Sequence, residues 1–151
     1  MTVYVENLQS CSIAYIRTIG LYGAANAATM EQMKRWAASN GLLGEDAVVL
    51  GIAQDNPETT LPDRCRYDTC IVVPRDFSTN DPAICRGSIT GGKYAVFRIE
   101  HTAAAMQQAW AEIFPEISKQ RWQLDAARPV LERYQLKLVQ QHECEICVPI
   151  V

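Results

Sequence analysis

CSIAYIRTI, at Cys11–Ile19, alternates around β-branched and aromatic residues and stops at a glycine-flanked loop, which predicts a β-strand. Residues at helical spacing follow and predict a helix over residues 27–39, closed by an Asn-Gly stop. Two more strands are predicted at Ala47–Ala53 and Arg66–Val73, because each run is closed by turn residues or by a proline. This part of the chain therefore has the order strand, helix, strand, strand.

The same order is predicted again further along the chain. Residues 85–99 indicate a strand, a tight hairpin turn at Gly91 and Gly92, and a second strand, because adjacent glycines tolerate the positive φ of such turns. A helix is predicted to begin near His101, with apolar residues at spacings of three and four. It is expected to stop or bend at Pro115, since proline breaks the hydrogen-bond pattern of a helix.

The C-terminal segment completes the second copy. Short helical turns and loop are expected over residues 116–127, followed by strands at Val130–Val139 and Glu143–Ile150. Short similarities support a duplication, since Ala14–Arg17 resembles Ala95–Arg98 and each run opens one copy.

The predicted fold class is α+β, with two pseudo-symmetric β-α-β-β halves forming a mainly antiparallel, curved sheet. Two main helices are expected on one face of that sheet. The chain is predicted to be a single domain over residues 1–151, with halves at about 11–76 and 84–151. The seam between two similar halves is a natural place for a cleft.

Composition excludes several classes of function. The formal charge is −3, and the 14 Lys and Arg residues are spread along the chain, so no direct contact with nucleic acid is expected. The longest apolar runs, such as Ala47–Ala53, are far shorter than the roughly 20 residues that span a bilayer. We therefore expect a cytoplasmic protein that has no signal peptide and does not act at a membrane.

No metal or other cofactor is expected. Of six cysteines only Cys144 and Cys147 have a two-residue spacing, and no second close pair completes a zinc site. His101 and His142 have no nucleophile at motif spacing, and no glycine loop precedes a helix in the way that nucleotide binding requires. Free cysteines are then best explained as small buried hydrophobes.

Glu132 is the candidate for chemistry. On a strand it shares one face with Tyr134, while Leu131 and Arg133 point to the other. Glu132 either lies on a solvated face or lines a cleft, and a strand glutamate is more often solvated. If tyrosines and tryptophans gather round this carboxylate, however, charge pairing and aromatic faces together make a site for an organic cation.

Four motifs resemble the DNA gyrase inhibitor-like (GyrI-like) small-molecule-binding domains. They are Arg64–Cys70, the Gly91–Phe97 hairpin, the helix centred on Trp110, and Pro129–Tyr134, in that order. The resemblance covers the chain from about residue 12 to its end. It implies the duplicated fold, and it implies a domain that occurs alone or as the effector-binding part of bacterial multidrug-responsive transcription regulators.

The resemblance also implies site residues. The family's pocket glutamate falls on Glu132 and its partner tyrosine on Tyr134, whereas Leu131 replaces an aromatic residue of the motif. The full set of expected ligand-binding residues is Glu132, Tyr134, Trp110, Tyr67, Tyr94 and Tyr22. Because a strand is expected by about residue 11, we predict a stand-alone domain with no preceding helix-turn-helix.

Three functions stay open at this point. The first is the binding of a hydrophobic, cationic small molecule such as rhodamine or tetraphenylphosphonium, for effector binding, sequestration or drug resistance. The second is hydrolysis of strained electrophilic toxins, with Glu132 as the general base, since some relatives do this. The third is a protein partner, either gyrase, as the family name implies, or a separate regulator. Binding is the preferred interpretation, and an enzyme the less favoured one.

Overall fold

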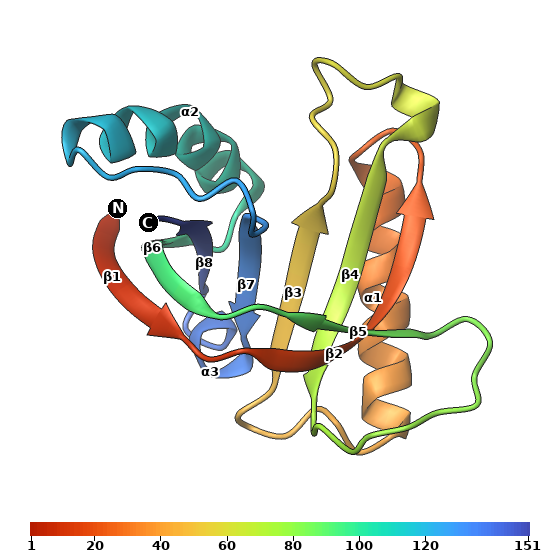
Figure 1. The fold of residues 1–151 in the computed structure, drawn as a ribbon. Coiled ribbons are helices and arrows are strands. Elements are labelled where there is room, and N and C mark those ends of the chain that lie inside the picture. The colour runs from red at the N-terminus through yellow and green to blue at the C-terminus, as the bar shows by residue number, and fades with distance from the viewer.

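The computed structural model describes residues 1–151 and contains one curved, eight-stranded antiparallel sheet with helices packed against it (Figure 1). The strand order is β1-β6-β8-β7-β3-β4-β2-β5. This confirms the predicted α+β class. The elements are β1 (Thr2–Leu8), β2 (Cys11–Ile19), α1 (Ala24–Ser39), β3 (Val48–Ala53), a 3-10 turn (Pro62–Arg64), β4 (Arg66–Val73), β5 (Cys85–Ile89), β6 (Gly92–Glu100), α2 (Ala103–Lys119), β7 (Leu131–Gln135), α3 (Leu136–Val139) and β8 (Glu143–Pro149).

The two halves have the same internal pairing. In the first half β4 lies between β3 and β2, and in the second half β8 lies between β7 and β6. Antiparallel pairing of β3 with β7 joins the halves into one sheet. The predicted pair of β-α-β-β halves is thus confirmed, whereas the boundaries at about 11–76 and 84–151, and the single domain over the whole chain, stay predictions.

The predicted hairpin at residues 85–99 is wrong. β5 pairs with β2 and β6 pairs with β1, so the chain runs on through Gly91 instead of reversing. Leu8 pairs with Gly92 and Cys11 with Ile89, which places β1-β2 and β5-β6 in one register as a long two-stranded ribbon. A Cβ atom on Gly91 would overlap the Leu8 carbonyl oxygen, so this glycine permits close backbone approach between the ribbon strands.

Three further boundaries differ from the prediction. β1, at the N-terminal end of the chain, was not expected. It pairs with the edge of β6 that does not pair with β8. The strand expected at Val130–Val139 ends at Gln135, and Leu136–Val139 forms the short helix α3. α2 continues through Pro115 to Lys119, because buried side chains on both sides of the proline hold the helix against the sheet.

Three hydrophobic clusters hold these layers together. One lies between α1 and the β2, β3 and β4 strands, and a second lies between α2 and the β6 and β8 strands. Val49 and Tyr134 are paired on β3 and β7 and point to the helix face in both halves, so both main helices cover the same face of the sheet. The third cluster fills the opposite face, beneath the long ribbon.

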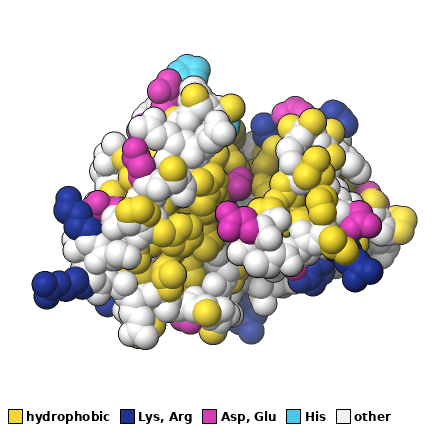
Figure 2. Space-filling model, turned by 90° about the horizontal axis from the view of Figure 1, so that it is seen from above, with side chains coloured by type: hydrophobic (Ala, Val, Ile, Leu, Met, Phe, Trp, Pro, Cys, Tyr) yellow, Lys and Arg dark blue, Asp and Glu magenta, His cyan; other side chains and the backbone are white.

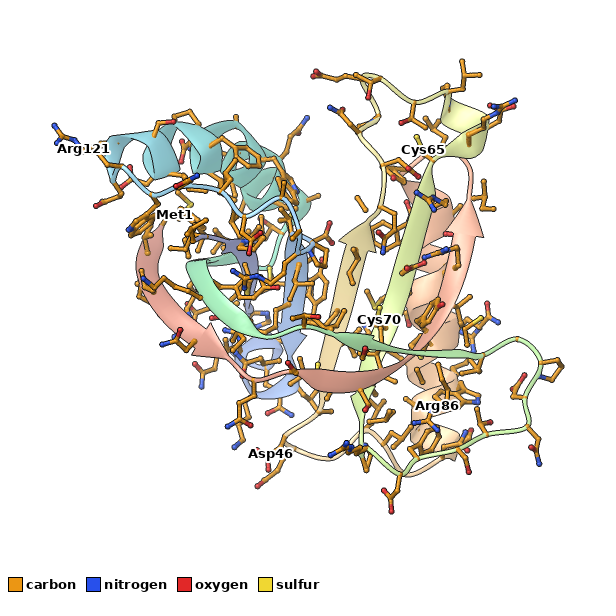
Figure 3. The ribbon with its side chains drawn as sticks, viewed as in Figure 1. Met1, Asp46, Cys65, Cys70, Arg86 and Arg121 are labelled. Atoms are coloured by element: carbon orange, nitrogen blue, oxygen red, sulfur yellow. The ribbon has the colours of Figure 1, made fainter.

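The cysteines lie mostly within these clusters and form no disulfide. Cys70 on β4 lies close to the long two-stranded ribbon, whereas Cys65 immediately precedes β4 (Figure 3). No group of three or more His, Cys, Asp or Glu side chains lies together in an arrangement that could hold a metal ion. None of the helices has the length and apolar character needed to cross a bilayer.

Candidate functional site

A large cavity lies on the helix face of the sheet, above the seam where β3 meets β7. Its volume is about 930 Å³, and 13 of its 19 lining residues are hydrophobic. α1 and α2 contribute to its walls, and the residues of α3 close one end. Figure 2 shows a hollow between two lobes, with hydrophobic side chains on both walls. Cavities of this size and lining hold drug-sized molecules in many proteins.

Glu132 lies in the floor of the cavity and faces Gly51 across the β3-β7 pairing. In β3, Gly51 precedes the residue that pairs with the buried Asp68. In β7, Glu132 precedes the residue that pairs with Glu145, the counterpart of Asp68 in the second half. The two positions are therefore equivalent in the duplicated fold, and only one of them carries a carboxylate.

Gly51 makes room for the contacts of that carboxylate. A Cβ atom at this position would overlap the Tyr67 hydroxyl oxygen and lie 3.0 Å from Oε2 of Glu132. The absence of a side chain thus allows Tyr67 to reach across β3 to Glu132. A glycine within a buried strand often marks such a close approach.

Two tyrosines hold Glu132 in place. Oε2 of Glu132 accepts hydrogen bonds from the Tyr67 hydroxyl at 2.9 Å and from the Tyr134 hydroxyl at 2.8 Å. No arginine, lysine or histidine forms an ion pair with this carboxylate. Burial raises the pKa of Glu132, and the two hydrogen bonds oppose that rise only in part. The site is an acid that lacks a protein counter-charge.

The same burial keeps the two tyrosines protonated. Desolvation, together with the nearby Glu132 charge, raises the pKa values of Tyr67 and Tyr134 far above the ordinary value for tyrosine. Both phenols therefore stay hydrogen-bond donors at neutral pH, and they leave the second carboxylate oxygen, Oε1, without a protein partner. A carboxylate has about four acceptor positions, so capacity remains for a ligand.

Aromatic side chains extend the site on both sides of Glu132. Tyr22 packs edge-on against Tyr67, with ring centroids 6.0 Å apart. On the other side, His101 packs against Tyr134 at 5.5 Å. Trp110 on α2 also lines the cavity. Burial, with a smaller effect of the Lys34 charge, lowers the pKa of His101.

Five of the six expected site residues lie together in this cavity, but Tyr94 does not. The structure does not bring Tyr94 together with the others, because the side chains of β6 alternate and Tyr94 points to the face opposite α2. It is fully buried there, with the Arg128 guanidinium carbon 4.7 Å from its ring centroid. The remaining five are Tyr22, Tyr67, Trp110, Glu132 and Tyr134.

Three residues that shape the chemistry of the site were not among the expected site residues: Gly51, which lies beneath Tyr67, and the lining residues Lys34 and His101. Gly51 could have been noticed as a glycine inside an apolar strand run, which often marks a bulge or close approach. His101 carries no signal in the sequence beyond its place near a helix start, and Lys34 carries none beyond helical spacing. Both basic side chains line the cavity.

The opposite face of the sheet carries a second set of buried charges. Glu145 is completely buried and accepts hydrogen bonds from Tyr4 at 2.5 Å and from Arg133 at 2.9 Å. The two terminal nitrogens of Arg133, Nη1 and Nη2, donate hydrogen bonds to the carboxylate of Glu6, both at 3.1 Å. These partners more than offset burial and lower the pKa of Glu145. A carboxylate paired so fully is a structural group.

Comparison with protein families gives one match over the whole chain. Residues 1–151 match a model described as the GyrI-like small molecule binding domain. The chain is 41% identical over 151 residues, 99% of both chains, to a protein of Bacillus subtilis described as an SPbeta prophage-derived transcriptional regulator, YosT. It is 27% identical over 137 residues to a DNA gyrase inhibitor of Cronobacter sakazakii, with 89% of this chain and 85% of that protein covered.

Solved structures share the fold at low sequence identity. EcmrR in its DNA complex aligns with a TM-score of 0.76 at 14% identity over 99% of this chain, which spans only 57% of the EcmrR chain. SAV2435 bound to tetraphenylphosphonium aligns with a TM-score of 0.62 at 17% identity, covering 100% of this chain and 94% of that one. A hydrolase from Listeria innocua aligns with a TM-score of 0.64 at 10% identity, covering 99% and 91%.

Proposed function

This chain belongs to the family of GyrI-like small-molecule-binding domains, and from that premise we propose that it binds a hydrophobic organic cation in the cavity above β3 and β7. Glu132 supplies the counter-charge. Tyr22, Tyr67, Trp110 and Tyr134 supply apolar and aromatic surface around the ligand.

The observation that carries this proposal is the state of Glu132. Its carboxylate lies in the floor of an apolar cavity, bound by two neutral phenols and by no basic side chain. A buried carboxylate without a counter-charge is costly, and a bound cation relieves that cost by direct pairing. Aromatic faces add further attraction for a delocalised cation.

The relatives support the same class of ligand. SAV2435 shares the fold, and its solved structure has tetraphenylphosphonium, a hydrophobic cation, bound to the protein. YosT and EcmrR point toward regulation, because one is described as a transcriptional regulator and the other forms a complex with DNA. We infer that the bound molecule acts as an effector or is sequestered by the protein, either of which suits a role in drug resistance.

Calorimetry with tetraphenylphosphonium tests the proposal. We expect saturable binding to the native protein and a roughly 10- to 100-fold weaker affinity for Glu132→Gln, which keeps the shape of the side chain and removes its charge. Glu58→Gln is the matched control, because Glu58 is exposed and outside the cavity. The neutral triphenylphosphine oxide should bind more weakly than the cation. Equal affinities for the native protein and Glu132→Gln would contradict the proposal.

A second candidate function is hydrolysis with Glu132 as a general base. It is favoured by the raised pKa of Glu132, since a base works best when its pKa is near the working pH. A hydrolase from Listeria innocua shares the fold. Incubation with epoxide and cyclopropane electrophiles, followed by mass spectrometry, should then show addition of water that Glu132→Gln abolishes. Absence of turnover across the panel counts against this function.

The third function, a gyrase partner, stays a prediction. Its support is the 27% identity to a protein named as a DNA gyrase inhibitor, and no feature of the surface adds to it. Retention of gyrase on the immobilised protein would be needed to raise it to the level of the other two.

A further inference from the structure

Glu132 is not the only ionisable group in the cavity, because Lys34 and His101 also line it. Neither forms an ion pair with Glu132. The one ion pair of Lys34 is a 3.4 Å contact with Glu31, three residues earlier on α1, where 43% of the Lys34 side chain and 63% of the Glu31 side chain are exposed. Exposed pairs of this kind are weak, so the Lys34 ammonium group can pair with a ligand.

The basic groups lie at one end of the cavity, toward α3. His101 packs against Tyr134, which lies two residues beyond Glu132 along β7, and Leu136 of α3 follows. At a rise of about 3.3 Å per residue, Tyr134 is about 7 Å and Leu136 about 13 Å from the level of Glu132. The acid therefore lies further from the α3 end of the cavity than His101 does.

Lys34 reaches the same end from the opposite wall. It follows Ala27 and Met30 on the cavity face of α1, at helical spacing. α1 runs from the end of β2 toward the start of β3, so its later residues lie level with the start of β3 (Figure 1). The charge on Lys34 contributes to lowering the pKa of His101, in agreement with this proximity.

The cavity thus carries an acidic group, Glu132, and two basic groups, Lys34 and His101, at separate places within apolar walls. A ligand with a single positive charge uses Glu132 and leaves Lys34 beside apolar surface. A ligand with a second, acidic group uses both ends at once, and a neutral His101 can donate a hydrogen bond to the same group.

We propose that the ligand is a hydrophobic molecule of mixed charge, with a delocalised cation at Glu132 and a carboxylate or similar acceptor about 7 to 13 Å away at Lys34 and His101. This inference deepens the proposed function and rests on it. Lys34 is then the residue that selects such molecules over simple hydrophobic cations.

Two rhodamine dyes test the inference, because they differ in one group only. Rhodamine 19 carries a free carboxylate, and rhodamine 6G is the ethyl ester of the same cation. By calorimetry at neutral pH we expect the native protein to bind the carboxylate dye roughly three- to tenfold more tightly than the ester. Binding of the ester tests the proposed function, and the ratio of the two affinities tests the mixed-charge inference.

The variant Lys34→Met assigns the preference to its residue. It removes the charge from a half-exposed helix position and keeps the length of the side chain, so the fold should not change. The affinity ratio should fall to about one, whereas Lys119→Met, at an exposed position of α2 outside the cavity, should keep the native ratio. Glu132→Gln should weaken binding of both dyes.

Each of the other possible results contradicts either the mixed-charge inference or the proposed function. If the native protein binds both dyes equally or prefers the ester, the mixed-charge inference is wrong and cation binding stands. If the native preference persists in Lys34→Met, Lys34 is not the selecting residue and the inference is again wrong. If neither dye binds, both the inference and the proposed function are wrong for this ligand class.

Discussion

At the scale of single residues, the site depends on the contrast between Gly51 and Glu132. The duplicated fold places them at equivalent positions, directly across the seam from each other. One half has a glycine there, and the other half carries an acid. Tyr67 occupies the space above Gly51 that a side chain would otherwise fill. From there its hydroxyl, together with that of Tyr134, donates a hydrogen bond to the single carboxylate of Glu132.

Gly51→Ala should therefore disturb both stability and binding. The new methyl group would overlap the Tyr67 hydroxyl and displace it from Glu132, and overpacking of this kind costs about 1 to 3 kcal/mol. Urea denaturation should show that loss, and a Tyr67→Phe background should reduce it. Gly44→Ala is the control, because nothing lies within 4 Å of a Cβ atom there. A Gly51→Ala protein as stable as the native one would contradict the crowded geometry.

Cation affinity should rise with pH as Glu132 ionises. Its pKa is raised above the ordinary value of 4.5, so the neutral acid persists to a higher pH in the folded protein. The folded state binds more protons than the unfolded state in that window, so the free energy of unfolding should fall as pH rises through it. Tyr67 and Tyr134 stay protonated throughout, whereas His101, with its lowered pKa, gains charge only at acidic pH.

The measurement is a titration with tetraphenylphosphonium from about pH 5 to about pH 8 in the native protein and in Glu132→Gln. The native affinity should increase and then level off, and the variant should show only the weaker effect of charge on His101. A native affinity that is constant over this range would mean that Glu132 is already fully ionised at its lower limit.

At the scale of elements, alternation and helical spacing were sufficient to predict most of the fold. The strands β2, β3 and β4 and the alternation that sets Glu132 and Tyr134 on one face follow from local patterns. The failures come from contacts distant in sequence. Gly91 was interpreted as a turn because glycine favours turns, but β1 is the partner that keeps the chain extended through it.

The candidate site shows the same division. Glu132 and Tyr134 could be placed together from their spacing and from the family motif, whereas Tyr67, Tyr22 and Trp110 were expected only as aromatic side chains that could surround the carboxylate. Tyr94 lies apart from them on the opposite face of the sheet, and the sequence alone gave no indication of which face of its strand is turned to the helices. Lys34 could not have been found from one sequence, since a lysine on an amphipathic helix lies in solvent far more often than in a cavity.

At the scale of the whole molecule, β1 and β5 are exchanged between the halves. β1 precedes β2 in the chain but pairs with β6, and β5 precedes β6 but pairs with β2. As a result, one continuous ribbon of β1-β2 and β5-β6 runs across both halves of the curved sheet. The cavity lies on the helix face of this sheet, where the two halves meet, and Figures 1 and 2 show the curved sheet and the hollow between the two lobes.

Buried polar groups accompany this exchange in both halves. In the first half Asp68 is held by Arg17 and Gln54, with Arg17 bonding both carboxylate oxygens. In the second half Glu145 is held at the equivalent place by Arg98 and by Gln135. The repetition of acid, arginine and glutamine supports the duplication more strongly than the short sequence similarities do.

The second half adds an ion pair that the first half lacks, and its loss should be costly. Arg133 links Glu145 on β8 to Glu6 on β1, whereas Ile52 occupies the equivalent position in the first half. Arg133→Ile should destabilise the protein by about 3 to 5 kcal/mol, because a completely buried carboxylate loses its nearest cation. Glu6→Gln should cost about 1 kcal/mol or less, since 36% of the Glu6 side chain is exposed. Urea denaturation of both variants measures the difference, and similar losses would show that the anchoring of β1, and not the burial of Glu145, sets the energy of this network.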